Sequence, residues 1–122
     1  MKQILIIRTK FPNINGIRKG KLIAQGAHAS VSAVFDGLSR PDTKHHVEQW
    51  FTHGQTKIAV GIHSEEELLD LWEKIQATGL ASAIIKDAGK TEFGGQVTLT
   101  AIGFGPAPTN LVDPITRHLS LL

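Results

Sequence analysis

The feature that most constrains the fold is a continuous run of mostly β-branched residues at positions 3–9, Gln-Ile-Leu-Ile-Ile-Arg-Thr. A strand with one face in water alternates apolar and polar residues, whereas this run does not alternate. It therefore predicts a strand buried on both faces, which requires a layer of structure on each side of the sheet.

Patterns along the remainder of the chain predict helices and further strands. We expect Asp36-Gly37 to end the first helix and Asp42 to cap the second. Ser64 and Glu67 form a capping-box pattern ahead of a helix with an apolar face. We expect strands at residues 57–62, 83–85 and 97–104, and helices at about 19–35, 42–52, 64–79 and 113–119, the last with Pro114 in its first turn. The first three strands are joined through helices, so we expect them to be parallel. The short link from the third strand to the fourth favours antiparallel pairing of those two strands. The sequence predicts one α/β domain over residues 1–122, with a four-stranded mixed sheet and helices on both faces.

Composition limits both the chemistry and the location of the protein. A chain of 122 residues fits a single domain. It contains no cysteine, which rules out a disulfide framework, a thiolate metal site and a thiol nucleophile, and fits a reducing compartment. The apolar run near the start is too short for a secretory signal and is interrupted by Arg8, and no segment is long enough to span a membrane. We therefore expect a cytoplasmic protein.

Charge is distributed unevenly along the chain. Residues 1–44 carry eight Lys and Arg against Asp36 and Asp42, a net charge of +6, whereas residues 45–122 carry five Lys and Arg against nine Asp and Glu, a net charge of −4. A basic pole suggests a polyanionic partner such as nucleic acid. Scattered solvated lysines would explain the charge equally well, so this indication needs support from motifs.

The first expected helix carries a narrow polar stripe. At 100° per residue, one arc of roughly 60° contains Lys21, Gln25, His28 and Ser32, while the rest of residues 22–35 is small or apolar. The stripe could be the solvent face of a helix packed on the sheet. A solvent face would be wider and richer in Glu and Lys, so we interpret the stripe as the wall of a cleft.

A second polar group, Lys-Asp-Ala-Gly-Lys-Thr at residues 86–91, directly follows an expected strand. Ligands of open α/β sheets gather beyond the carboxyl ends of parallel strands, where the first helix also begins. Asp and Gly are common in ordinary turns, so the placement of this loop carries more weight than its composition. We expect the loop and the stripe to share one cleft.

Three segments together resemble the type 2 peptidyl-tRNA hydrolases. Residues 20–29, Gly-Lys-Leu-Ile-Ala-Gln-Gly-Ala-His-Ala, resemble the family signature Gly-Lys-x-x-Ala-Gln-x-x-His-Ala. Residues 87–91, Asp-Ala-Gly-Lys-Thr, resemble its Asp-Ala-Gly-(Arg/Lys)-Thr loop, and residues 98–106, Thr-Leu-Thr-Ala-Ile-Gly-Phe-Gly-Pro, look like its closing strand and Gly-Pro turn. Two loops depart from the family pattern: the loop before the first helix is longer, with Arg18 where glycine is common, and the turn after Thr91 is about one residue shorter.

The resemblance implies that the chain hydrolyses the ester bond of peptidyl-tRNA, releasing free tRNA and peptide, without a metal or another cofactor. It implies an active site formed by Lys21, Asp87, Thr91 and Thr98, with Gln25 and His28 lining it. It also suggests a homodimer. We also expect a basic rim for the tRNA phosphates, formed by Lys19, Lys21, Lys86 and Lys90. Our own interpretation of the stripe, the loop and this basic rim adds these substrate-binding residues: Lys19, Ser32, Lys86, Gly89 and Lys90.

Physical chemistry suggests a role for each active-site group. Ester hydrolysis needs a positioned water, stabilisation of the developing oxyanion and a hold on the polyanionic leaving group. The ammonium of Lys21 suits an oxyanion or the 3′-terminal phosphates. A nearby Lys21 would lower the pKa of Asp87 below about 3.9, which makes Asp87 a poor general base and favours a role in orienting water or a threonine hydroxyl. We expect Thr91 and Thr98 to position groups through hydrogen bonds, although threonine is also simply a good strand residue.

Several alternatives remain open at this stage. His28 could transfer protons, but we expect a hydrogen-bonded packing residue first. The residues His45, His46 and His53 could suggest a metal site, but they lack the spacing of a known one, so we expect them to lie along the second helix. A non-catalytic RNA-binding or adaptor domain would not need the stripe and the Asp87 loop to converge. A hydrolase of another acyl ester is the other alternative, which the basic pole makes less attractive.

Overall fold

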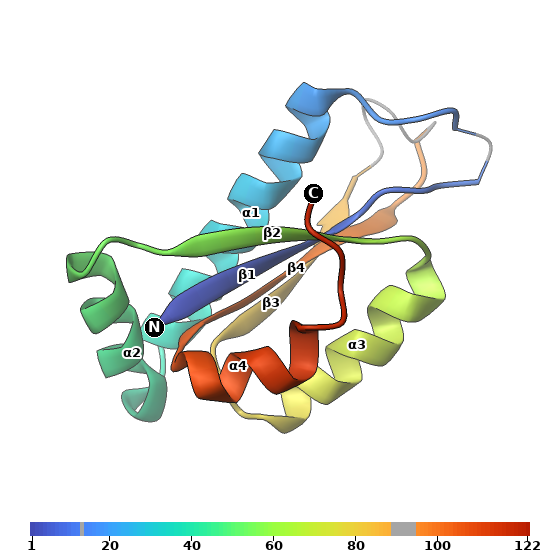
Figure 1. Ribbon diagram of the computed structural model, residues 1–122. Coiled ribbons are helices and arrows are strands. Elements are labelled where there is room, and N and C mark those ends of the chain that lie inside the picture. Colours follow the sequence, from blue (N-terminus) through green and yellow to red (C-terminus); the bar gives the residue numbers. More distant parts are fainter. Residues whose placement is uncertain (13, 89–94) are drawn as a thin grey trace.

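The computed structural model describes residues 1–12, 14–88 and 95–122. These residues form four strands and four helices (Figure 1). The strands are β1 (Lys2–Arg8), β2 (Lys57–Ile62), β3 (Ser82–Asp87) and β4 (Thr98–Ala107). The helices are α1 (Lys19–Leu38), α2 (Pro41–Thr52), α3 (Glu65–Ala77) and α4 (Thr109–Thr116).

The strands form one mixed sheet in the order β2-β1-β4-β3. Strand β1 pairs in parallel with β2 and antiparallel with β4, and β3 pairs antiparallel with β4. Strands β1, β2 and β3 therefore all point the same way, and β4 alone runs against them. This confirms the predicted four-stranded mixed sheet and the predicted direction of each strand.

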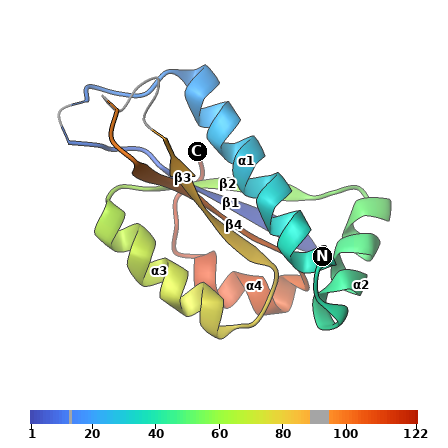
Figure 2. The same ribbon diagram turned by 180° about the vertical axis from the view of Figure 1, so that it is seen from behind.

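Helices cover both faces of the sheet, with α1 and α2 on one side and α3 and α4 on the other (Figures 1 and 2). The larger core lies between the sheet and α3 and α4, where Ile6 and Phe104 pack with Leu68 and Ile75. A smaller cluster lies under α1 and includes Ile7. Because neighbouring residues of β1 enter different cores, the strand is buried on both faces as its sequence predicts. Among the residues that the structure describes, no helix is long and apolar enough to cross a membrane.

Helix α1 packs against β4 at very short range because Gly103 has no side chain. A Cβ added at Gly103 would lie 2.2 Å from the main-chain oxygen of Ala29 and 2.9 Å from the Cβ of Ala33. A second close approach occurs near the carboxyl end of α1, where a Cβ on Gly37 would lie 2.6 Å from the Cγ2 of Val47 in α2. These glycines let α1 lie directly on the sheet and α2 directly on α1.

Several predicted boundaries were wrong, among them the end of β4, which extends to Ala107 and not only to residue 104. Helix α1 continues to Leu38, because Gly37 serves the contact with α2 and does not end the helix. Helix α2 begins at Pro41, whose fixed φ suits the first helical position, so Asp42 lies inside the first turn and does not cap it. Helix α4 begins at Thr109, four residues before the predicted start, which places Pro114 inside the helix.

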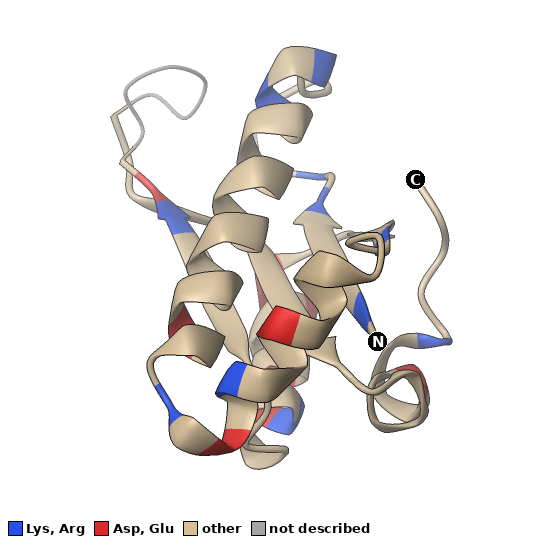
Figure 3. Cartoon of the chain, turned by 90° about the vertical axis from the view of Figure 1, so that its left-hand side faces the viewer, with Lys and Arg blue, Asp and Glu red and all other residues tan. Residues whose placement is uncertain are grey.

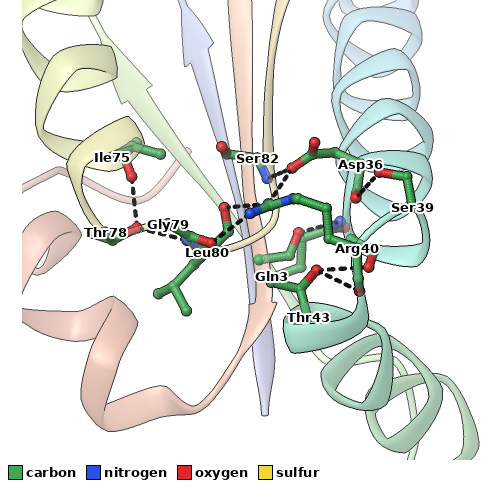
Figure 4. A network of polar contacts seen from close by, with 12 residues as sticks. Gln3, Asp36, Ser39, Arg40, Thr43, Ile75, Thr78, Gly79, Leu80 and Ser82 are labelled. Atoms are coloured by element: carbon green, nitrogen blue, oxygen red, sulfur yellow. Dashed lines mark hydrogen bonds and ion pairs between the residues drawn. The ribbon is translucent and has the colours of Figure 1, made fainter.

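A cluster of hydrogen bonds fastens the end of α1 to the start of β3 (Figure 4). The guanidinium of Arg40 donates to the main-chain oxygens of Gly79 at 2.8 Å and Leu80 at 3.2 Å, and to Asp36 Oδ2 at 2.7 Å. The same Asp36 oxygen accepts the main-chain N–H of Ser82 at 3.0 Å. Strand β3 is thereby held against α1 at the end opposite to its carboxyl terminus.

The final residues run along the outer edge of β2. The N–H of Gly61 donates to Ser120 O at 2.9 Å, and the N–H of Leu122 donates to Ala59 O at 3.1 Å. Val60 and Leu121 form an isolated antiparallel bridge. This edge of the sheet is therefore partly paired within the chain.

Candidate active site

The structure brings together Asp87, at the carboxyl end of β3, and two residues of the polar stripe on α1. Lys21 Nζ lies 2.5 Å from Asp87 Oδ2, and Gln25 Nε2 donates to the same oxygen at 2.9 Å. The side chains of Lys21 and Asp87 are only 14% and 10% exposed. Attraction between two charges is stronger where water is scarce, so this ion pair is firmly held.

Thr100 on β4 fixes the orientation of the Gln25 amide. Its buried hydroxyl donates to Gln25 Oε1 at 2.5 Å. Because the amide oxygen faces Thr100, the amide nitrogen must face Asp87. Lys21, Asp87, Gln25 and Thr100 thus form one hydrogen-bonded chain, drawn from α1, β3 and β4.

A β-bulge accounts for the position of Thr100. The pairing of β3 with β4 steps from Ile85↔Ala101 to Lys86↔Leu99, so Thr100 is the extra residue on β4. A bulge re-aims a side chain that regular alternation would send to the other face. Ala101 packs in the core beneath α1, and Thr100 turns towards the same helix.

The other predicted residues lie outside this chain of contacts. His28 is exposed and Ser32 is half-buried, and neither side chain belongs to the hydrogen-bonded chain of Lys21, Asp87, Gln25 and Thr100. The Thr98 hydroxyl donates to Gln96 O at 3.0 Å. Lys19 and Lys86 are exposed, in the first turn of α1 and on β3 respectively. Three predicted residues lie outside the described part of the chain: Gly89, Lys90 and Thr91.

Two residues of the region were not singled out by the sequence. Thr100 lies two positions from Thr98 on the same strand, and the bulge that selects it depends on pairing with β3. Arg8, at the end of β1, donates from Nε to Lys10 O at 3.0 Å and from Nη1 to Leu99 O at 3.2 Å. The available signal for Arg8 was a guanidinium directly after the apolar run of residues 4–7.

The predicted histidines lie on or next to α2. The rings of His45 and His46 have their centroids 4.2 Å apart, and His53 Nδ1 lies 2.7 Å from Gln49 O. Burial lowers the pKa of His46, the nearby His45 lowers it further, and Asp42 opposes the change. Within residues 1–12, 14–88 and 95–122, no three His, Asp or Glu side chains are grouped closely enough to hold a metal ion.

Basic residues lie at the amino end of α1, where the helix is coloured blue in Figure 3. Helix α1 carries two lysines in its first turn, Lys19 and Lys21, and no Asp or Glu before Asp36. Arg18 directly precedes the helix. This end of the molecule therefore presents positive charge beside the Asp87 carboxylate, an arrangement suited to a polyanionic ligand.

Comparison with known proteins agrees with these observations. The sequence model of the family described as peptidyl-tRNA hydrolase PTH2 matches residues 1–122. A peptidyl-tRNA hydrolase of Methanocaldococcus jannaschii is 40% identical over 122 residues, covering 100% of both chains. One from Sulfurisphaera tokodaii is 42% identical over 123 residues, covering 99% of this chain and 98% of the relative. A probable peptidyl-tRNA hydrolase 2 of Dictyostelium discoideum is 41% identical over 98% of this chain and 54% of its own length. The chain therefore belongs to the peptidyl-tRNA hydrolase PTH2 family.

Proposed function

We propose that this chain hydrolyses the ester that joins a peptide to the 3′ end of tRNA. The observation that carries the proposal is the nearly buried ion pair between Lys21 and Asp87, which Gln25 holds at the carboxyl end of β3. Family membership supplies the substrate class, and the basic amino end of α1 suits the phosphates of the leaving group.

Within this proposal, Asp87 acts on the attacking group and Lys21 acts on the negative charge that develops on the ester. The Asp87 carboxylate orients the attacking water or a threonine hydroxyl, because hydrogen bonds from Gln25 and Lys21 fix the carboxylate in place. The Lys21 ammonium stabilises the oxyanion that develops on the ester carbonyl. Thr100 positions Gln25 through its hydroxyl. The family resemblance gives the active-site role on β4 to Thr98, so Thr98 and Thr100 are competing candidates for that role.

The test is release of peptide from peptidyl-tRNA, with a free aminoacyl ester as the comparison substrate. Asp87→Asn and Lys21→Ala should each lower the rate by about 10²–10³-fold, since each removes one preorganised electrostatic contact. His28→Ala should lower it much less, because His28 is exposed and lies outside the Asp87 network. Wild-type protein that binds tRNA without hydrolysing it would favour a binding domain, and equal turnover of the free ester would favour a general esterase.

A second ion pair provides matched controls. Lys2 at the start of β1 pairs with Asp113 of α4, far from the carboxyl end of β3 (Figure 1). Lys2→Ala and Asp113→Asn make the same chemical changes to a Lys–Asp pair. They should lower stability without lowering the rate. If they lowered the rate as much as the variants of Lys21 and Asp87, loss of stability would explain both results.

We also propose that the chain forms a homodimer through α1. The outward face of α1 carries an apolar row at intervals of four residues, in which Ile23, Val31 and Phe35 are 72%, 56% and 70% exposed. The row adjoins an apolar groove of about 670 Å³ between α1 and β2. A second copy would cover the row with an identical uncharged row, as a two-fold interface requires.

Sedimentation measures this assembly directly. We expect the mass of a dimer for the wild type and of a monomer for Val31→Lys. Leu111→Lys changes another exposed apolar residue, on α4, and should leave the dimer intact. A wild-type chain that stays monomeric at micromolar concentration contradicts the proposal.

The substrate also suggests where the protein acts. Peptidyl-tRNA arises on ribosomes, so we propose a cytoplasmic enzyme. A tagged chain recovered chiefly outside the cytoplasmic fraction of its own cells would contradict this location.

A further inference from the structure

The guanidinium of Arg8 lies at the junction of three segments near the candidate site. It donates hydrogen bonds to the main-chain oxygens of Lys10 and Leu99, at 3.0 and 3.2 Å. It also lies over the ring of Phe11, with its central carbon 4.4 Å from the ring centroid. Arg8 is only 7% exposed, and burial lowers its pKa while Glu65 opposes the change. A buried cation is costly, so a specific use for it is expected.

The Leu99 oxygen belongs to the peptide unit that enters the bulge. Thr100 is the extra residue of β4, so the regular β3–β4 register does not fix its conformation. The carbonyl carbon of Leu99 is bonded to the nitrogen of Thr100, and a peptide unit is planar. A hydrogen bond from Arg8 to Leu99 O therefore restrains the backbone at Thr100.

From Thr100 the restraint passes to Asp87 through two hydrogen bonds. The Thr100 hydroxyl donates to Gln25 Oε1 at 2.5 Å, and Gln25 Nε2 donates to Asp87 Oδ2 at 2.9 Å. Thr100 is 1% exposed, so water has little opportunity to replace its hydroxyl as the partner of Gln25. In such a network each member limits the orientation of the next.

We infer that Arg8 is a positioning residue for the hydrolysis: it holds the Leu99–Thr100 peptide so that Thr100 and Gln25 keep Asp87 in its orientation against Lys21. The inference rests on the proposed function. It differs from a role in tRNA binding, because Arg8 acts here through β4 and not on a phosphate.

Arg40 offers a matched control for the structural contribution of an arginine. It also donates to two main-chain oxygens, those of Gly79 and Leu80, and it pairs with Asp36 (Figure 4). These partners lie at the end of α1 and just before β3, and within the described part of the chain none of them belongs to the Gln25–Asp87 chain. Both arginines thus stabilise the fold through carbonyl groups, but only Arg8 connects to the site.

The experiment compares Arg8→Lys with Arg40→Lys in the full chain, measuring kcat, KM and Tm with peptidyl-tRNA. Both should lower Tm, because lysine cannot reproduce the paired donors. Arg8→Lys should also lower kcat by about ten- to a hundredfold with KM changed less than twofold, since small misplacements of reacting groups cost on the order of 10² in rate. Arg40→Lys should leave kcat unchanged. If Arg8→Lys does not fold, Arg8→Gln, which keeps a planar amide donor, replaces it.

A double variant separates the proposed route from a general loss of order. Thr100→Val already removes the hydroxyl, so adding Arg8→Lys should lower kcat by much less than it does in the wild type. Full multiplication of the two effects overturns the inference, as does an equal loss of kcat in Arg40→Lys. A raised KM with unchanged kcat overturns it too and assigns Arg8 to tRNA binding. Absence of hydrolysis by the wild type would instead count against the proposed function, before any variant is compared.

Discussion

Replacing Gly103 by Ala tests whether the close contact between α1 and β4 sets the geometry of the candidate site. The added Cβ would lie 2.2 Å from Ala29 O and 2.8 Å from the Ala29 carbonyl carbon. Atoms in ordinary contact are about 3.5 Å apart, so α1 must move from the sheet by on the order of 1 Å. The two nearest obstructing atoms belong to the main chain of Ala29, so a smaller side chain at position 29 or 33 cannot relieve the conflict.

This displacement should affect stability and turnover together. Overpacking of this kind costs about 1–3 kcal/mol of the free energy of unfolding. Lys21 and Gln25 move with α1, while Asp87 and Thr100 stay with the sheet, so the 2.9 Å and 2.5 Å hydrogen bonds of Gln25 would lengthen. A shift of about 1 Å in a reacting arrangement lowers the rate on the order of 10²-fold.

Gly26→Ala is the control on the same helix. Its Cβ would lie 3.7 Å from Leu5 Cδ1 and 3.8 Å from Ile7 Cδ1, which are ordinary contacts. Because alanine is the better helix former, this variant should gain up to about 1 kcal/mol in stability and keep its turnover. Urea denaturation and kcat are measured for both proteins. A Gly103→Ala protein with wild-type stability and wild-type turnover would refute the reasoning.

Three further outcomes are expected. Thr100→Val leaves Gln25 Oε1 without its donor, so the free energy of unfolding should fall by about 1–3 kcal/mol and kcat should also fall. Thr98→Val should change the free energy of unfolding by less than about 0.5 kcal/mol. A larger fall in kcat for Thr98→Val than for Thr100→Val would make Thr98 the active-site threonine of β4. Lys19→Ala should weaken tRNA binding and reduce the slope of log affinity against log salt by about 0.7 per lost phosphate contact. Lys74→Ala, which changes an exposed lysine of α3, should leave that slope unchanged. Equal slopes for the two variants would contradict a basic rim localised at the candidate site. The folded-state pKa of His46 is below its ordinary value of 6.5, so the unfolded state takes up a proton first as the pH drops. The free energy of unfolding should therefore fall between pH 6.5 and the folded-state pKa. His46→Gln should flatten this pH dependence, and an unchanged pH profile in that variant would contradict the assignment to His46.

The sequence predicted the fold well where long patterns determine it. The β1 run, the apolar face of α3 and the Ser64–Glu67 capping box each depend on neighbouring residues alone. The cap is present, since Glu67 N donates to Ser64 Oγ at 3.1 Å. Boundaries that depend on partners were predicted less well. Gly37 looked like a helix end because its role in packing against Val47 becomes visible only once α2 is placed.

The candidate site was predicted in part for the same reason. Periodicity put Lys21 and Gln25 on one arc, and the strand before Asp87 put its carboxylate at the correct end of the sheet. The same arc includes His28, which is exposed in the structure. Helical periodicity alone does not show which residues of an arc border the strands. Thr100 was not predicted because a β-bulge depends on the pairing of two strands and leaves no pattern in the sequence of either strand.

The pairing of residues 120–122 with β2 has a consequence for the behaviour of the protein in concentrated solution. A bare strand edge offers its N–H and C=O groups to any other chain and so invites aggregation. Here the main chain of Ala59 and Gly61 is already hydrogen-bonded to Leu122 and Ser120. A foreign strand would first have to displace this tail, so β2 is protected from edge-to-edge association by a segment of only a few residues.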